Sequence, residues 1–187
     1  VTYLRAIALA EQELLRPMVP VARIGLAASI FAQGRDAMAL ITEIGGMLGA
    51  DDANLRFRLD ACAGRGLLRL GRPDAARSWL EAAIAGAQSG APDVEAEAWE
   101  DLSSLQAAAG DLAEAVHSME RAVTVLAATG SDKYLAAMLR LGALLERAGR
   151  REEARTTLDP IRQRYRWRLS PGLAEELEKI EVAWGED

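Results

Sequence analysis

The sequence predicts an all-α fold made of repeated helical hairpins, and three observations support this prediction. Half of the 187 residues are hydrophobic but only 5% are aromatic, and alanine and leucine, which are strong helix formers, fill most apolar positions. The β-branched and aromatic runs that strands need are nearly absent. A pattern of residues also recurs at a fixed step along the chain, which is typical of a repeat architecture.

The repeat step is 39 residues, and it separates Gly71, Gly110 and Gly149. Further columns keep the same step, and a looser copy lies upstream around Leu26, Ala27, Ile30, Gly34 and Ala39. Gln106 interrupts one column, where the other copies have Leu67 and Leu145. The columns in register are Ala76, Ala115 and Ala154; Leu80, Met119 and Leu158; Ala83, Ala122 and Ile161; Ala63, Leu102 and Leu141; and Gly64, Ser103 and Gly142.

Each copy is predicted to be a pair of helices joined by a short turn. Apolar residues recur every three or four positions in the first helix, and a glycine ends it because glycine adopts the left-handed conformation without a Cβ penalty. Pro73 suits the first turn of the second helix, where small alanines allow two backbones to approach closely. The predicted units of one domain over 1–187 are a half repeat at 1–17, hairpins at 20–50, 54–90, 93–130 and 132–168, and a capping helix at 171–185. The outer face of this capping helix is expected to carry Glu175, Glu178 and Glu181.

These columns resemble the tetratricopeptide repeat (TPR), which has a large residue, a leucine, a small residue, a glycine at the turn and alanines on the second helix. The copy Trp99, Leu102, Ser103, Gly110 and Ala115 fits this pattern. The usual proline after the second helix is absent, and the period exceeds the usual value of about 34. The long period is similar to that of the repeats in kinesin light chains and in large bacterial ATPase regulators. The resemblance covers roughly residues 20 to 185 and implies a right-handed α-α superhelix.

The resemblance also implies a concave groove that binds another protein, lined by the first helix of each hairpin. An arginine stripe on 54–70 is followed by acidic positions, so the expected partner is a peptide with the opposite order of charges; the alternative is that these arginines are merely solvated. The lysine-and-asparagine clamp of some TPR domains is not supported, because the only asparagine, Asn54, lies outside the groove positions. The expected groove residues are Arg58, Ala61, Cys62, Arg65, Leu68 and Arg69; Glu97, Glu100, Ser104 and Ala108; and Leu139, Ala143, Glu146 and Arg147.

Cys62 is the only cysteine, which excludes a disulfide within the chain and a cysteine-cluster zinc site. It shares a helical stripe with Arg58, Arg65 and Arg69. Nearby cations lower the pKa of a thiol, which would favour a reactive cysteine. The alternative is a buried and inert cysteine.

No motif in the sequence supports catalysis, a metal site or a cofactor site. His117 is the only histidine and has no second histidine or cysteine to share a metal, so we expect a surface or boundary residue. The glycine pairs at 45–46 and 64–66 lack the lysine of a phosphate-binding loop. We therefore expect that the protein is not an enzyme and needs no cofactor.

The net charge of −6 argues against nucleic-acid binding, which needs a broad basic surface. Basic and aromatic residues do alternate near the C-terminus, at Arg162, Arg164, Tyr165, Arg166, Trp167 and Arg168. This pattern can mark single-strand binding, but in a helix it would scatter the arginines, and the acidic segment 169–187 can neutralise them.

We also expect no membrane span, because the longest apolar stretch, 18–32, is short and contains Pro20 and Arg23. A signal peptide is not apparent, so a cytoplasmic location is expected.

The leading hypothesis is a protein-interaction module. The alternatives are a scaffold that forms a homodimer through a terminal repeat, and a sensor segment of a larger bacterial transcriptional or ATPase regulator.

Overall fold

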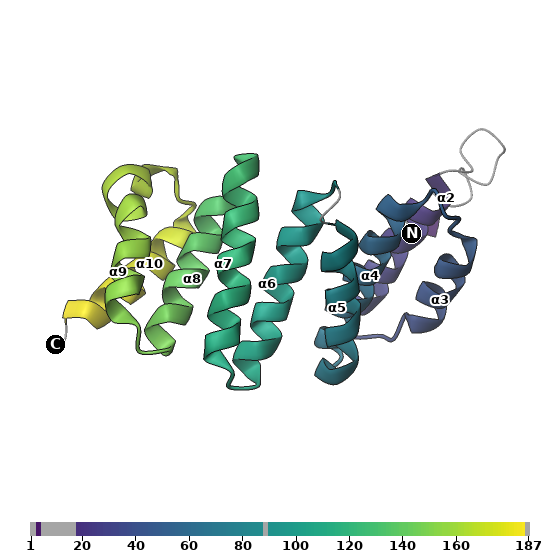
Figure 1. Ribbon diagram of the computed structural model, residues 1–187, viewed down its shortest axis with the longest axis horizontal. Coiled ribbons are helices and arrows are strands. Elements are labelled where there is room, and N and C mark those ends of the chain that lie inside the picture. The colour runs from purple at the N-terminus through teal and green to yellow at the C-terminus, as the bar shows by residue number, and fades with distance from the viewer. Residues whose placement is uncertain (1–2, 5–17, 88–89, 186–187) are drawn as a thin grey trace. The chain divides into compact units, whose positions relative to one another are not determined.

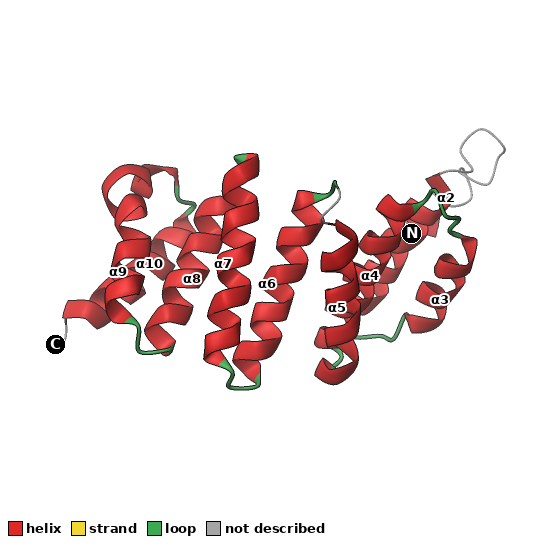
Figure 2. Cartoon of the chain, viewed as in Figure 1, coloured by secondary structure: helices red, strands yellow, loops and turns green. Residues whose placement is uncertain are grey.

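The computed structural model describes residues 3–4, 18–87 and 90–185. All regular secondary structure within these residues is helical, which confirms the all-α prediction (Figure 2). The chain forms two compact units, residues 1–105 and residues 106–187; that they belong to one repeat domain stays a prediction. The expected half repeat at 1–17 lies almost wholly outside the described residues, and the homodimer that it suggested also stays a prediction.

The described residues of the N-terminal unit include five helices, and short loops join most of them (Figure 1). Helix α2 packs on α3 and α4, and α4 packs on α5. The last turn of α6 belongs to the C-terminal unit. The helices are α2 (Val19–Ala32), α3 (Met38–Met47), α4 (Ala53–Arg69), α5 (Pro73–Ala87) and α6 (Pro92–Ala108).

The C-terminal unit continues with helices that pack on α8, which contacts α7, α9 and α10. Its core contains Met138, Leu139, Leu158, Ile161 and Leu177. Helix α9 passes directly into a π-helix and then a 3-10 turn, which the sequence did not predict. The elements are α7 (Leu112–Thr129), α8 (Tyr134–Arg147), α9 (Arg151–Pro160), the π-helix Ile161–Tyr165, the 3-10 turn Arg166–Arg168 and α10 (Pro171–Gly185).

The glycines predicted to end helices have positive φ angles, as the predictions required. At Gly149 φ is 75°, its N–H donates to the carbonyl of Glu146, and the N–H of Arg150 donates to the carbonyl of Leu145, each at 2.9 Å. Gly71 repeats this pair of bonds, with Leu68 and Leu67 as acceptors. The pattern is the Schellman motif, which satisfies carbonyls at a helix end.

Replacing Gly149 with alanine is expected to lower the free energy of unfolding by about 1–2 kcal/mol, because a Cβ disfavours the left-handed conformation. Chemical denaturation measures this loss. Gly172→Ala is the matched control in the same unit, because its backbone is not left-handed and a Cβ there meets no atom within 4 Å. An equal loss in both variants would contradict this account of the turn.

The small-residue columns allow helices to approach closely. Ala76, Ala115 and Ala154 are completely buried. A Cβ added to Gly64 would lie 2.7 Å from Cγ and Cδ2 of Leu80 on α5. These positions therefore tolerate only small side chains, as the sequence pattern predicted.

Gln106, which interrupts the leucine column, is also buried, at 5% exposure. Its side-chain oxygen accepts a 2.7 Å hydrogen bond from the hydroxyl of Ser118 on α7, which is itself 1% exposed. A buried amide costs little when it is hydrogen-bonded in this way. The break in the apolar column is thus matched by a polar partner on the next helix.

A helix forms where the capping helix was predicted, as α10, and its apolar side packs into the C-terminal core through Leu177, Ile180 and Trp184; that it caps the repeat array stays a prediction. The indole N–H of Trp184 donates to a carboxylate oxygen of Glu146. Guanidinium groups of Arg155 and Arg162 lie 5.7 and 5.4 Å from the ring centre, within cation–π range. These contacts hold the last helix against α8 and α9.

The outward acidic face predicted for α10 is correct for Glu175 and Glu178, which are exposed. It is wrong for Glu181, whose side chain is only 20% exposed and accepts from Arg162 and Arg166. Both arginines precede α10 in the turn that follows α9, so they draw this carboxylate inward.

Candidate functional site

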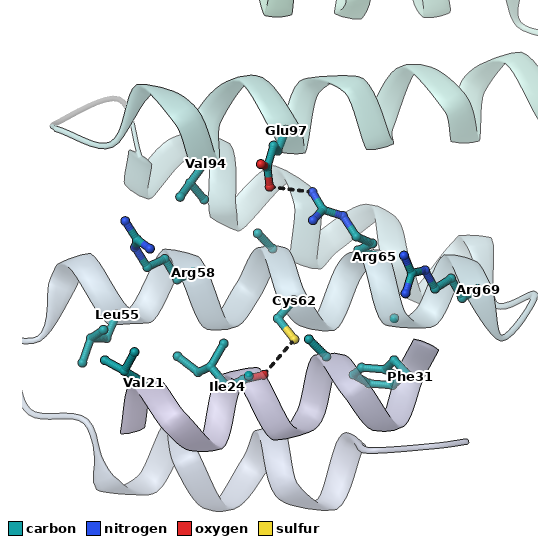
Figure 3. A pocket seen from close by; sticks show the side chains of 14 residues that line it. Val21, Ile24, Phe31, Leu55, Arg58, Cys62, Arg65, Arg69, Val94 and Glu97 are labelled. Carbon is teal, nitrogen blue, oxygen red and sulfur yellow. Dashed lines mark hydrogen bonds and ion pairs between the residues drawn. The ribbon is translucent and has the colours of Figure 1, made fainter. Parts of the chain in front are cut away.

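Helices α2, α4 and α6 of the N-terminal unit enclose a cavity of about 420 Å³. Figure 3 shows α4 running through the site with side chains from α2 on one side of it and from α6 on the other. The apolar lining comes from all three helices: Val21, Ile24, Ala28, Phe31, Leu55, Ala61 and Val94. The cavity thus combines an apolar interior with the charged residues of α4.

Six of the predicted groove residues line this cavity, namely Arg58, Ala61, Cys62, Arg65, Arg69 and Glu97. Five of them lie on α4, and four of these, Arg58, Cys62, Arg65 and Arg69, follow one another at steps of four, three and four residues, which places them on one face of the helix. Arg58 and Arg69 point into the region from different turns of α4, with Cys62 between them (Figure 3). Their spacing of eleven residues corresponds to about 16 Å along the helix axis.

Arg65 joins α4 to α6 through two ion pairs. Its Nε atom lies 2.7 Å from Oδ2 of Asp101, and its Nη2 atom lies 3.0 Å from Oε2 of Glu97. Burial opposes the charge on Arg65, but the two carboxylates outweigh it and raise the pKa of Arg65. Burial raises the pKa of Asp101 above its usual value, although Arg65 opposes that shift. Arg65 is therefore occupied in holding two walls of the cavity together.

Arg58 and Arg69 differ from Arg65, because both side chains are exposed. Their guanidinium groups form no salt bridge with any residue that the structure describes. The only carboxylate among the lining residues, that of Glu97, is paired with Arg65. The cavity therefore has, at the ends of an apolar surface, two guanidinium groups without a salt bridge to a described residue; Arg69 also interacts at longer range with the carboxylate of Asp101. This arrangement favours an anionic occupant.

Cys62 is not the activated thiol that its arginine neighbours suggested. Its sulfur contacts the carbonyl oxygen of Ile24 at 3.8 Å, and burial raises its pKa to about 11, although Arg65 and Arg69 oppose the shift. The cost of desolvating a thiolate exceeds the attraction of the two cations. The raised pKa favours the inert alternative, and the half-buried Cys62 contributes to the cavity wall.

The raised pKa of Cys62 predicts slow alkylation in the folded protein. At pH 8 only about one thiol in a thousand would be ionised, against roughly a quarter in an unfolded chain. Because a high-pKa thiolate is also the stronger nucleophile, the net expectation is reaction with iodoacetamide about ten- to twentyfold slower than in denaturant. Mass spectrometry follows the single thiol directly, and equal rates in the two conditions would disprove the shift.

The remaining groove predictions on α6 do not line the cavity. Glu100 is half-buried, and its carbonyl oxygen accepts a 3.0 Å hydrogen bond from the hydroxyl of Ser104. Leu68 on α4 packs against the hydrophobic core instead, and Ala108 lies in the C-terminal unit. The acidic section of the groove is thus represented at the cavity by Glu97 alone.

The predicted groove residues on α8 belong to the C-terminal unit, and a groove shared with the N-terminal unit stays a prediction. Leu139 is wrong as a surface residue, because it is 1% exposed and packs in the core. Glu146 pairs with Arg151 at 3.6 Å and accepts a hydrogen bond from the indole N–H of Trp184, so it holds α10 against α8. Ala143 is half-buried and Arg147 is exposed.

Sequence reasoning missed the wall formed by α2, which includes Val21, Ile24 and Phe31. The signal was present in the apolar stretch 18–32, which is hydrophobic on most of its faces and has more apolar surface than its own hairpin buries. Val21 is 42% exposed, so part of that surface is open beside the cavity.

The described residues contain neither a metal-binding cluster nor a membrane-spanning helix. Within the described residues, no group of three or more histidine, cysteine, aspartate and glutamate side chains lies in position to hold a metal ion. None of the described helices has the length and apolar character needed to cross a membrane.

No protein-family model matches the chain, and no curated protein matches its sequence. Its structure is similar to a kinesin-light-chain-like protein with nearly identical TPR-like repeats from Podosopora anserina, with a TM-score of 0.71 and 19% identity over 88% of this chain and 86% of that one. A single-residue variant of that protein matches with a TM-score of 0.72 and 20% identity over the same shares. The fold is TPR-like. The 39-residue period as a subfamily trait stays a prediction.

Proposed function

We propose that the protein is an interaction module that binds a peptide or helix of another protein in the α2–α4–α6 cavity. The observation that carries this proposal is the apolar surface of the cavity between the guanidinium groups of Arg58 and Arg69, which form no salt bridge with a described residue. The TPR-like fold is compatible with such a role but does not by itself supply a function.

The chemistry of the cavity describes the partner. Apolar side chains of the partner would pack between Ile24, Phe31 and Val94, and carboxylates on either side would pair with Arg58 and Arg69. A separation of about 16 Å corresponds to roughly five residues of extended chain or eleven residues of helix. The apolar contact would supply most of the affinity, while the charges would set the register and direction of binding.

Selection from a random peptide library displayed on phage tests this proposal without a known partner. The native chain is compared with the double variant Arg58→Glu/Arg69→Glu, and with Ala28→Trp, which fills the cavity from an exposed lining position. We expect the native chain to enrich apolar peptides with flanking acidic residues, and both variants to lose them.

The matched control is Arg35→Glu/Arg77→Glu, which changes the same charge at two exposed arginines of the N-terminal unit outside the cavity. It should retain the peptides that the native chain enriches. The proposal fails if no peptide is enriched, or if the cavity variants and this control retain the same peptides equally well.

A further inference from the structure

The segment between α9 and α10 leaves α-helical geometry at a proline. Pro160 lacks a backbone N–H, so it cannot donate the hydrogen bond of a continuing α-helix. The next five residues, Ile161–Tyr165, form a π-helix, and Arg166–Arg168 form a 3-10 turn. Such departures from regular geometry often occur at functional positions. The expectation of an α-helix that scatters four arginines around itself is therefore wrong here.

The turn separates its arginines into two pairs. Arg162 and Arg166 face α10, where their guanidinium groups lie 2.9 and 3.2 Å from carboxylate oxygens of Glu181. Arg162 also pairs with Asp159 at 3.0 Å. These bonds fix the turn to the last helix, so the first pair has a structural role.

The second pair, Arg164 and Arg168, is exposed and forms no salt bridge with any described residue. Both lie close in sequence to Trp167, which is 81% exposed. The indole N–H of Trp167 donates to the carbonyl of Arg164 at 2.9 Å, which holds the ring in place at the surface. Its one polar group is thus satisfied internally, and the ring presents its apolar faces outward.

A recess lies beside this surface. Tyr165 and Arg168 line a cavity of about 340 Å³ that extends to the end of α7 and the start of α8. Leu126, Tyr134 and Leu135 contribute apolar and aromatic surface to it. An apolar side chain of a bound segment would have a place to enter next to an unpaired guanidinium group.

We infer that Trp167, Arg164 and Arg168 form a second protein-interaction surface, which binds an acidic segment carrying an apolar side chain. Tryptophan and arginine are the residues that most often dominate binding energy at interfaces, and a ring already held in place loses little entropy on binding. The two guanidinium groups select carboxylates. This surface belongs to the C-terminal unit, so it does not depend on the α2–α4–α6 cavity.

Single-stranded nucleic acid fits this surface less well than an acidic peptide. Such ligands need a basic path that follows the phosphate backbone, but two of the four arginines here are already paired with carboxylates. The net charge of −6 also opposes a ligand that carries one negative charge per nucleotide more strongly than a peptide with only two carboxylates.

The test is a selection from the same random peptide library, with the native chain as bait and with Trp167→Ala and Arg168→Glu as variants. The matched control is Arg121→Glu, at an exposed arginine of α7 that lies outside the recess and outside the predicted groove. We expect a class of acidic apolar peptides whose affinity falls about tenfold or more in both variants and is unchanged by the control and by Arg58→Glu/Arg69→Glu.

Fluorescence polarisation with labelled oligothymidylate at physiological salt is the second measurement, and no binding is expected. The inference is overturned if every enriched peptide binds Trp167→Ala as well as it binds the native chain. It is also overturned if no peptide is enriched, or if oligothymidylate binds the native chain and loses affinity in Trp167→Ala. Because peptides for the α2–α4–α6 cavity respond to different variants, failure of one proposal is distinguishable from failure of the other.

Discussion

Replacing Phe31 with alanine is expected to lower the free energy of unfolding by about 3–5 kcal/mol, the usual cost of truncating a buried phenylalanine. The ring is 1% exposed and packs in the core of the N-terminal unit with Ile41, Leu59 and Ala63. It also lies directly on α4 at Gly66, where an added Cβ would be 2.3 Å from its Cδ2 atom. Chemical denaturation of the two proteins measures the difference.

The contact between Phe31 and Gly66 can be isolated with a double-mutant cycle. Gly66→Ala alone is expected to cost about 1–3 kcal/mol, because the new methyl group forces the ring to move. In the Phe31→Ala background the three ring atoms that this methyl group would meet are gone, so the same change should be nearly neutral. The costs of the two single variants should therefore not add in the double variant.

Gly46→Ala is the control for the effect of an alanine in a helix. Gly46 lies within α3, and an added Cβ there meets no atom within 4 Å, so a gain of about 0.5–1 kcal/mol is expected. If the costs of Phe31→Ala and Gly66→Ala add in full, the close approach of α2 and α4 does not depend on this glycine.

Phe31 belongs both to the hydrophobic core and to the cavity wall. The same ring packs in the core and lines the α2–α4–α6 cavity, so its truncation changes stability and binding together. Ala28→Trp changes the cavity from an exposed position and is the better probe of function. The site is thus built on the core of the unit, which keeps its wall rigid.

The sequence predicted the turns because they are local requirements of the backbone, and left-handed φ at Gly71 demands glycine whatever the distant parts of the chain do. The small residue at Gly64 serves a contact with Leu80 on the next helix, and it was predictable because the repeat places a small residue at the same position in each copy. The face of α4 was also predictable, because residues on a single helix keep a fixed angular spacing. Neither the turns nor this helix face needs knowledge of tertiary contacts.

Other features of the site depend on how deeply a side chain is buried and on its contacts with helices that are distant in the sequence. The charge pattern around Cys62 suggested activation, but the pKa of the thiol follows its burial against α2, which a single helix cannot reveal. Arg65 forms salt bridges with two carboxylates of α6, whereas Arg58 forms none with any described residue. This difference likewise depends on which carboxylates α6 places near each arginine. Identical residue types on one stripe therefore have different roles.

Leu158→Ala is expected to lower the free energy of unfolding by about 2–5 kcal/mol through the C-terminal unit. Leu158 lies on α9, is 0% exposed and packs against Met138, Ile161 and Leu177. Val182→Ala is the control in the same unit, because Val182 is 56% exposed and its truncation should change stability by no more than about 0.5 kcal/mol.

The energetic partner of Leu158 is Gly142, on the facing side of α8. A Cβ at Gly142 would lie 2.6, 2.7 and 2.9 Å from Cδ1, Cγ and Cδ2 of Leu158, and all three atoms are absent from Leu158→Ala. Gly142→Ala should therefore cost about 1–3 kcal/mol in the native chain. In the truncated background the same methyl group would partly fill the cavity that the leucine leaves, and stability should be unchanged or higher. Equal costs in both backgrounds would mean that α8 and α9 adjust their separation freely, and that the small-residue column does not set the distance between them.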